Sequence, residues 1–352
     1  MENISRFVDK SDKKILCSFY SEAYGDKHIL HNSTHHNWQF QNNPCNENNT
    51  KSIAITLNDN EISSHFGLIP ISLKIFNDVK SCCWLVSVFT LNRYRKKGLA
   101  DKLVKYVSKF FDSLMILSYS EEILRVYLKN GFVSHGDLNR YVGIINKKKL
   151  ESFINHKITK DNLELKDKIK INRIVKLPDN YEIFWNNVKN QFPITINRTR
   201  EYLTWRYFDH PLIDYHFMTL NKNNDMAGYC VLRFEDQNDE LTVCRIIDLV
   251  IKKGFEDEFI QQIINYCYGK VDFIDYFCTG NFYDYVLTKK NFFNNLKFNF
   301  NIPMVFNPID LKRKPSINFV YKDINLKLNK DQKDDPNLWY FVKGDSDQDR
   351  AF

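Results

Sequence analysis

A short basic turn between an expected strand and an expected helix is the part of the sequence best suited to chemistry. Its residues are Arg95, Lys96, Lys97, Gly98, Leu99 and Ala100. The first amides of a helix lack backbone acceptors and lie at the positive end of the helix dipole. Gly98 and Ala100 let an anion approach these amides, and the three cations add full charges. The spacing matches neither the P-loop nor the glycine-rich dinucleotide motif, so it predicts another kind of diphosphate site.

Two histidines and a group of cationic and aromatic residues could activate or bind a substrate. Histidine side chains ordinarily titrate near neutral pH, so His35 and His36 are candidate general bases, with a polar loop surface as the alternative role. In the second half of the chain, another group could hold a phosphate and stack on a base or sugar. Its members are Arg198, Arg200, Trp205, Arg206 and Tyr207, with Trp38 at the matching position of the first half. The alternative is a helix with an aromatic core face and solvated arginines.

Alternating carboxylates follow an aromatic run near the end of the sequence. Asp345 and Asp347 are the candidates among them for contact with a substrate amine or hydroxyl, and a solvated turn is the alternative. Asp349 continues the alternation, but the later Gly and Glu of a calcium loop are missing. The cysteines show no spacing typical of a zinc site either, so we expect no metal.

The elements expected around these residues follow from apolar spacing and turn residues. Strands are expected at 51–57, 65–75, 83–90 and 114–119. Helices are expected at 12–24, from Leu99 to Phe110, and at 121–130, the last ending at Gly131. One or two closing strands are expected within 132–145. The basic turn therefore joins the end of a strand to the start of a helix.

The order of elements then repeats, which favours a duplicated α/β unit over coincidence in an aromatic-rich chain. Trp38 and Trp205 are each followed by an aromatic residue two positions later and by a proline six positions later. A strand, a hairpin, a β run and an amphipathic helix come next in both halves. The second half has only Lys252-Lys253-Gly254-Phe255 between its β run and its helix. We therefore predict that only the first half holds a diphosphate.

Length and composition fit two globular domains. The chain has 352 residues, 43% of them apolar, and a net charge of +7. This charge suits a polyanionic small ligand and is too weak and too evenly spread to indicate nucleic acid. We predict a first domain at 1–150, a linker at 151–176 and a second domain at 177–352. Without a signal-peptide core or a membrane-length apolar stretch, a cytoplasmic protein with reduced cysteines is expected.

Residues 84–132 resemble the Gcn5-related N-acetyltransferase (GNAT) superfamily. The family pattern is a strand, an Arg/Gln-x-x-Gly-x-Gly/Ala turn, a helix, a strand and a short helix ending near Tyr-x-x-x-Gly-Phe. The matching segments here are 86–90, 94–100 and 127–132. The whole chain also resembles tandem GNAT proteins of bacterial surface-polysaccharide synthesis, through residues 205–211 and 345–350. The resemblance implies an α/β fold with mixed sheets in two GNAT-like modules, the second of them degenerate.

The resemblance also implies roles for individual residues, with coenzyme A (CoA) or an acyl-CoA as the cosubstrate. The main-chain amides of residues 96–100 would hold the CoA diphosphate. The strand residues that would pair edge-on with the pantetheine amides are Val88, Phe89 and Thr90. Ser120 stands where the family often has an asparagine that contacts pantetheine, and Tyr127 where the general acid protonates the leaving thiolate. Asn92 replaces the family's usual proline before the Tyr-Arg pair.

The activity implied is an N-acyltransferase that moves an acetyl or 3-hydroxybutanoyl group to the amine of a dTDP- or UDP-linked amino-dideoxy sugar. The amine would attack the thioester directly, and a strand amide near Phe89 or Thr90 would stabilise the oxyanion. The partner is then a small nucleotide sugar, with no nucleic acid and no membrane, and the protein is a monomer or a weak homo-oligomer. The alternatives are a protein or peptide N-acetyltransferase and a non-catalytic acyl-CoA-binding module.

Overall fold

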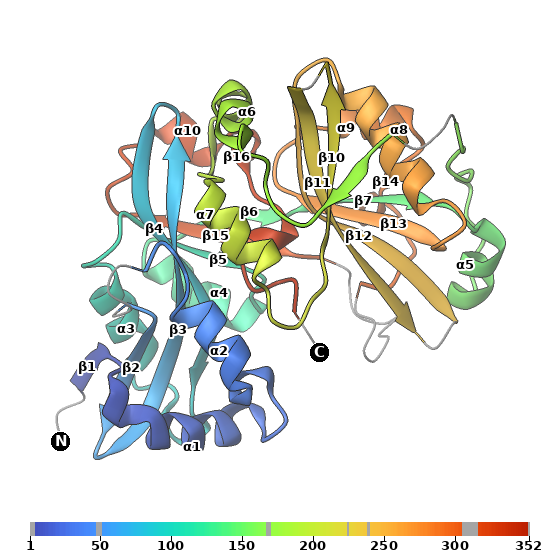
Figure 1. Cartoon of the computed structure of the whole chain (residues 1–352). Helices are drawn as coiled ribbons and strands as arrows, with labels where there is room; N and C mark the ends of the chain where they lie inside the picture. The colour runs from blue at the N-terminus through green and yellow to red at the C-terminus, as the bar shows by residue number, and fades with distance from the viewer. Residues whose placement is uncertain are drawn as a thin grey trace.

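Two mixed β-sheets lie next to each other and contain all the strands of the described residues (Figure 1). The computed structural model describes residues 4–46, 51–166, 170–223, 225–237, 240–304 and 316–350. The strands of the first sheet, in spatial order, are β1 (Ile4–Phe7), β2 (Ile53–Asn58), β3 (Glu61–Ile75), β4 (Asp78–Thr90), β5 (Ser113–Leu117), β15 (Asn318–Asp323) and β6 (Val133–Asp137). Two short strands continue this sheet, because β9 (Ile194–Ile196) pairs with the end of β3 and β16 (Trp339–Tyr340) pairs with β9.

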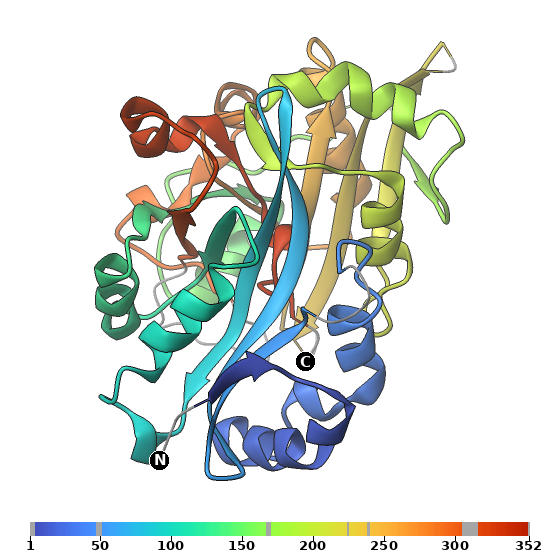
Figure 2. The ribbon, with the colours of Figure 1, turned by 90° about the vertical axis from the view of Figure 1, so that its left-hand side faces the viewer.

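The second sheet has the same arrangement of strands. In spatial order it contains β14 (Phe293–Asn294), β7 (Asn139–Ile144), β13 (Phe273–Cys278), β12 (Leu241–Ile251), β11 (Asp225–Gln237), β10 (His216–Lys222) and β8 (Asn172–Ile174). Figure 2 shows the long hairpin of the first sheet standing beside the strands of the second, with the N-terminal helices below both.

The helices pack around the two sheets, and some of them lie between the sheets (Figure 1). Those next to the first sheet are α1 (Lys13–Tyr24), α2 (Ser33–Phe40), α3 (Leu99–Val107) and α4 (Glu121–Lys129). Those of the second half are α6 (Tyr181–Val188), α7 (Arg200–Leu203), α8 (Glu256–Cys267) and α9 (Asp284–Lys289), with a π-helical turn, η6 (Thr204–Phe208), directly after α7. Two further helices are α5 (Lys147–Ile154) and α10 (Lys330–Asp334). Within the described residues, no helix is both long enough and apolar enough to cross a bilayer.

The predicted duplication is confirmed strand by strand. The run β2–β3–β4 and then β5 matches β10–β11–β12 and then β13, antiparallel except for the parallel pairs β4–β5 and β12–β13. A helix follows β4 and β12, and a second helix follows β5 and β13. We call the first sheet with α1–α4 the first module, and the second sheet with α8 and α9 the second module. The predicted fold class of two mixed α/β modules is therefore correct.

Each module takes one strand from the other half of the sequence, which corrects the predicted domain boundaries. Strand β7 lies within 1–150 but pairs with β13 and β14 in the second sheet. Strand β15 lies within 177–352 but pairs with β5 and β6 in the first sheet. The predicted linker 151–176 contains part of α5 and the whole of β8, which pairs with β10. Apolar patterns locate strands well, but they do not indicate which sheet a strand joins.

The two repeated tryptophans meet where the modules pack together. The indole Nε1 of Trp38 donates to the carbonyl of Trp205 at 2.8 Å, and the indole of Trp205 donates to the carbonyl of Trp38 at 2.8 Å. Their rings stack at 5.2 Å between centroids. This reciprocal contact is what two related units produce when they pack around an approximate two-fold axis.

Candidate active site

The basic turn places free main-chain amides at the start of a nine-residue helix. Lys96 and Gly98 both have positive φ angles, 63° and 72°, so the chain turns sharply before α3 begins at Leu99. The first helical bond runs from the Lys102 N–H to the Gly98 carbonyl. The amides of Leu99, Ala100 and Asp101 therefore precede the intrahelical ladder, and Gly98 has no side chain to cap them. A Cβ at Gly98 would meet open space, so an anion has room to approach.

The charges around this turn leave it basic. Arg95, Lys96 and Lys97 are exposed, and the Arg95 guanidinium lies over the Phe89 ring at 5.4 Å. The nearby Arg93 is already paired with Glu22 and Glu61. Asp101, in the first turn of α3, accepts a hydrogen bond from the Asn130 side chain at 2.8 Å. These contacts engage the local carboxylates, so the three cations dominate the field at the helix start.

Strand β4 leads into the turn with an open edge. Its register with the parallel neighbour β5 ends at Trp84 and Met115, although β4 continues to Thr90. Residues 87–90 are only half buried. The Leu91 N–H donates to the Ser63 carbonyl of β3. By strand alternation the main-chain groups of Phe89 also point toward β3, whereas those of Val88 and Thr90 point toward the open edge. An extended amide chain could therefore pair with β4 beside the basic turn.

The corresponding part of the second module is closed and acidic. Helix α8 begins with Glu256, Asp257 and Glu258, and the Gly254 N–H donates to the Glu256 carboxylate at 2.7 Å. Beside β12, Gly344 fits so tightly that a Cβ would approach the Ile247 carbonyl oxygen to 2.9 Å. Carboxylates occupy the helix start, and the C-terminal segment fills the space beside the strand. The two helix starts therefore differ in charge and access, and the diphosphate site in the first half alone stays a prediction.

Two tyrosines and two histidines of the first module gather beside β4. His36 Nε2 lies 3.4 Å from the Tyr20 hydroxyl, which lies 3.3 Å from His65 Nε2. The other ring nitrogen of His65 lies 3.0 Å from the Ser87 carbonyl oxygen, and the Tyr24 hydroxyl donates to the same oxygen at 2.7 Å. Burial lowers the pKa of His36 and of His65 to about 4, so both are neutral at pH 7. The predicted base candidate His36 thus belongs to a buried hydrogen-bonded chain.

Tyr20, Tyr24 and His65 are not among the site residues predicted from the sequence. His65 occupies a strand whose other residues are almost all buried, and its own exposure is 0%. A titratable residue inside an apolar strand run is the signal that could have found it. His35 lies apart from this chain, with its ring 5.4 Å from Trp38, and burial and then Arg206 lower its pKa to about 4.

The two candidates on and before α4 lie across from β4. Tyr127 is buried between the rings of Tyr119 and Phe132, and burial raises its pKa, so its hydroxyl stays protonated. Ser120 is exposed and occupies the N-cap position of α4. The second module has Leu287 at the position of Tyr127, and both residues accept a main-chain bond from the phenylalanine five positions later. The general-acid role of Tyr127 and the pantetheine contact of Ser120 stay predictions.

Two of the arginines predicted to bind a substrate, Arg198 and Arg206, instead anchor the C-terminal segment. Arg198 is buried and pairs with Asp248 at 3.1 Å and with Asp345 at 3.2 Å. Arg206, also buried, donates to the carbonyls of Gly344 and Ser346, each at 2.6 Å. Buried cations need such partners, so these side chains are already satisfied within the protein.

The remaining members of that set are likewise engaged. The Tyr207 hydroxyl donates to the Asp248 carboxylate at 3.2 Å, and Arg200 pairs with Glu182 at 2.7 Å. Trp38 and Trp205 bond to each other's carbonyls. The prediction of a substrate site at Trp38, Arg198, Arg200, Trp205, Arg206, Tyr207 and Asp345 is therefore corrected. Sequence pattern could not distinguish buried arginines with internal partners from solvated ones.

Asp347 differs from these residues because the anchored segment brings it to the first module. The neighbouring Gln348 donates to the Leu117 carbonyl at the end of β5, at 3.1 Å. Burial and then the charge of Asp347 raise the pKa of Tyr24, the residue whose hydroxyl contacts the Ser87 carbonyl. Its side chain is 12% exposed and pairs with Arg350 at 3.4 Å. The solvated-turn alternative is therefore wrong for this part of the tail.

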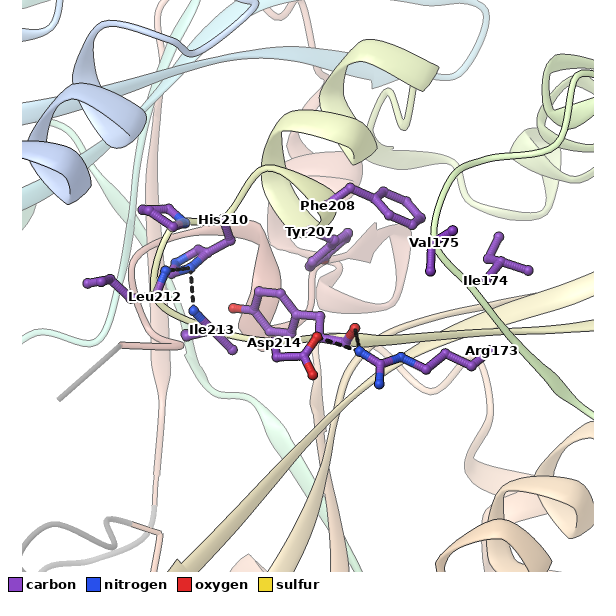
Figure 3. Close-up of a pocket in the computed structure, with 11 residues that line it drawn as sticks. Arg173, Ile174, Val175, Tyr207, Phe208, His210, Leu212, Ile213 and Asp214 are labelled. Atoms are coloured by element: carbon purple, nitrogen blue, oxygen red, sulfur yellow. Dashed lines mark hydrogen bonds and ion pairs between the residues drawn. The ribbon is translucent and has the colours of Figure 1, made fainter.

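A separate pocket of about 480 Å³ lies in the second module beside η6 and β8 (Figure 3). Its polar features are an ion pair between Arg173 and Asp214 and the ring of His210. His210 Nδ1 accepts hydrogen bonds from the N–H groups of Leu212 at 3.2 Å and Ile213 at 3.0 Å. These contacts fix the neutral tautomer, with its proton on Nε2.

Comparison with known proteins defines the fold. No family model matches the sequence, and no curated protein matches it. Among solved structures, a Gcn5-related N-acetyltransferase from Anabaena variabilis matches with a TM-score of 0.58 at 10% identity, over 92% of this chain and 74% of that one. A probable N-acyltransferase from Enterococcus faecalis has a TM-score of 0.60 at 10% identity, over 93% and 74%.

The N-myristoyltransferase of Saccharomyces cerevisiae, solved with bound myristoyl-CoA, is similar over a still larger share of the chain. Its TM-score is 0.53 at 10% identity, over 96% of this chain and 88% of that one. At 10% identity the likeness shows the fold alone, and any chemical activity has to be argued from the residues of this chain. The chain has the GNAT fold, repeated in two modules that exchange one strand.

Proposed function

We propose that the protein is an acyl-CoA-dependent N-acyltransferase whose first module binds the acyl-CoA. The observation that carries this proposal is the open edge of β4, which runs directly into the uncapped start of α3. A pantetheine arm pairs with an extended strand, and a diphosphate binds helix amides with cations nearby. In CoA the pantetheine arm is joined directly to the diphosphate, just as the β4 edge leads directly to the start of α3. The likeness to N-acyltransferase structures supports the same assignment.

The reaction follows from the groups beside β4. A neutral amine attacks the thioester carbon, the carbonyl oxygen becomes an oxyanion beside a β4 amide, and the C–S bond breaks. The leaving thiolate takes a proton from Tyr127, and the proton lost by the amine passes to a base. His36 is neutral at pH 7 and can accept a proton, and Asp347, whose neighbour Gln348 bonds to the Leu117 carbonyl, is a second candidate acceptor.

A matched pair of variants tests CoA binding. Gly98 and Gly254 each precede a helix with a positive φ, and a Cβ at either meets nothing within 4 Å. Gly98→Asp places a carboxylate at the proposed diphosphate site, so we expect it to weaken CoA binding at least about tenfold by calorimetry. Gly254→Asp makes the same change in the second module and should leave the affinity unchanged. Absence of CoA binding to the wild type would overturn the proposal.

The acceptor proposed from the sequence is the amine of a dTDP- or UDP-linked amino-dideoxy sugar, with acetyl or 3-hydroxybutanoyl as the acyl group. Most of the residues predicted to hold it are buried, so its remaining support is Asp347 and the sequence resemblance. The test is thiol release from acetyl-CoA and 3-hydroxybutanoyl-CoA with a panel of acceptors. Release only with nucleotide-linked amino sugars supports this acceptor, and release only with peptide amines replaces it.

A further inference from the structure

A bulge in β4 lies at the centre of the proposed active site. His65 and Gly67 of β3 pair with Phe89 and Val86 of β4, so a single residue of β3 lies opposite Ser87 and Val88. Ser87 has a φ of 48°, which is uncommon for a residue with a side chain. Such a conformation persists only when the surroundings fix it, and it occurs often where the main chain has a task.

Two side chains hold this bulge through the Ser87 carbonyl oxygen. The Tyr24 hydroxyl of α1 donates to it at 2.7 Å, and His65 Nδ1 of β3 lies 3.0 Å from it. A carbonyl oxygen only accepts, so His65 carries its proton on Nδ1 and its Nε2 is an acceptor. The Tyr20 hydroxyl, 3.3 Å from Nε2, then donates to His65, and His36 donates to Tyr20 across 3.4 Å. Every donor in this chain therefore points toward Ser87.

The peptide group that these bonds fix has its other end at the open edge. The Ser87 C=O and the Val88 N–H belong to one planar trans peptide, so they point in opposite directions. The oxygen points to the His65 ring and to the Tyr24 hydroxyl, and the Val88 N–H therefore points away from both side chains. Bonds accepted by a carbonyl also polarise the amide and make its N–H a stronger donor.

We infer that Tyr24 and His65 are positioning residues that aim the Val88 N–H at the thioester oxygen, with Tyr20 and His36 fixing the tautomer of His65. The inference rests on the proposed function, because it requires an acyl-CoA beside β4. Neither side chain touches the reacting atoms. They set the direction and the strength of the donor that stabilises the oxyanion.

The test uses hydroxylamine as a small acceptor, so it does not depend on the natural one. Its nitrogen attacks the thioester carbon of acetyl-CoA, the C–S bond breaks, and a proton moves from nitrogen to sulfur. Tyr24→Phe removes one bond to Ser87 and should lower kcat roughly tenfold or more, with the calorimetric Kd for acetyl-CoA unchanged. Tyr106→Phe, a tyrosine of α3 that packs against Phe7 and Phe110, is the matched control and should be silent.

A second pair separates positioning from packing at His65. Asparagine can place an N–H near the site of Nδ1, whereas leucine has a similar volume and no donor. We expect His65→Asn to retain most of kcat and His65→Leu to lose it. Equal kcat for both, or Tyr24→Phe at wild-type kcat, would overturn this inference alone and leave the proposed function intact. A wild type that does not bind acetyl-CoA would overturn both.

Discussion

Lowering the pH should weaken the fold through His210, and the size of this effect follows from two hydrogen bonds. Its Nδ1 accepts from the N–H groups of Leu212 and Ile213, so protonation there breaks both bonds. Burial and then the charge of Arg206 lower the pKa of His210 to about 3 in the folded state. In the unfolded chain a histidine has a pKa of about 6.5.

The sign and the magnitude come from linkage. Below about pH 6.5 the unfolded chain binds more protons at His210 than the folded chain does. The stabilisation that depends on the neutral imidazole is therefore complete above about pH 6.5 and decreases as the pH drops toward 3. At pH 7 the free energy lost through His210 is about 0.2 kcal/mol, and at pH 5 it is about 2 kcal/mol. The difference is insensitive to whether the folded pKa is nearer 3 or 4, because both lie well below 5.

His210→Asn isolates this contribution. The asparagine oxygen can accept from the same two N–H groups but does not titrate, so the variant loses packing equally at both pH values. Urea unfolding, followed by tryptophan fluorescence, should show the wild type losing about 2 kcal/mol more than the variant between pH 7 and pH 5. Other titrating groups contribute equally to both proteins. Parallel losses in the two proteins would refute the assignment of a neutral, doubly bonded imidazole.

Two further predictions concern the module interface and the proposed acid. Trp38→Phe and Trp205→Phe should each lower the free energy of unfolding in urea by about 2–3 kcal/mol, because each leaves a buried carbonyl unpaired. A double-mutant cycle should give a coupling energy of about 1 kcal/mol between the two tryptophans. Additive losses would contradict a direct contact. Tyr127→Phe should lower kcat roughly a hundredfold with little change in CoA affinity by calorimetry, and an unchanged kcat would remove Tyr127 from the mechanism.

Local pattern predicted the elements of the first module well. The expected strand at 83–90 lies within β4, the expected helix at 121–130 corresponds to α4, and the basic turn joins β4 to α3 as predicted. These features depend on neighbours in the sequence: alternation, helix periodicity and a glycine with positive φ. The tryptophan repeat also predicted the duplication, because each copy retains the same order of elements.

Long-range contacts determine the roles of the residues that sequence pattern did not predict. Arg198 looked suitable for a phosphate, yet its partners Asp248 and Asp345 lie 50 and 147 positions away in the chain. His65 acquires its place through Tyr20 and Ser87, which belong to different elements. A single sequence gives the chemical type of each side chain, but it does not indicate whether an arginine is buried with internal partners or exposed. The substrate site was misplaced for this reason.

The exchange of β7 and β15 affects how the protein can be made. When β6 leaves the ribosome, the position between β5 and β6 is still empty, since β15 begins only at Asn318. At bacterial or eukaryotic synthesis rates, the nascent first sheet waits on the order of ten to forty seconds with two unpaired strand edges. During this delay we expect the unpaired edges to be protected by a chaperone or by a loosely collapsed first half. If the gene were split between the modules, each half made alone would lack the strand that the other half supplies to its sheet.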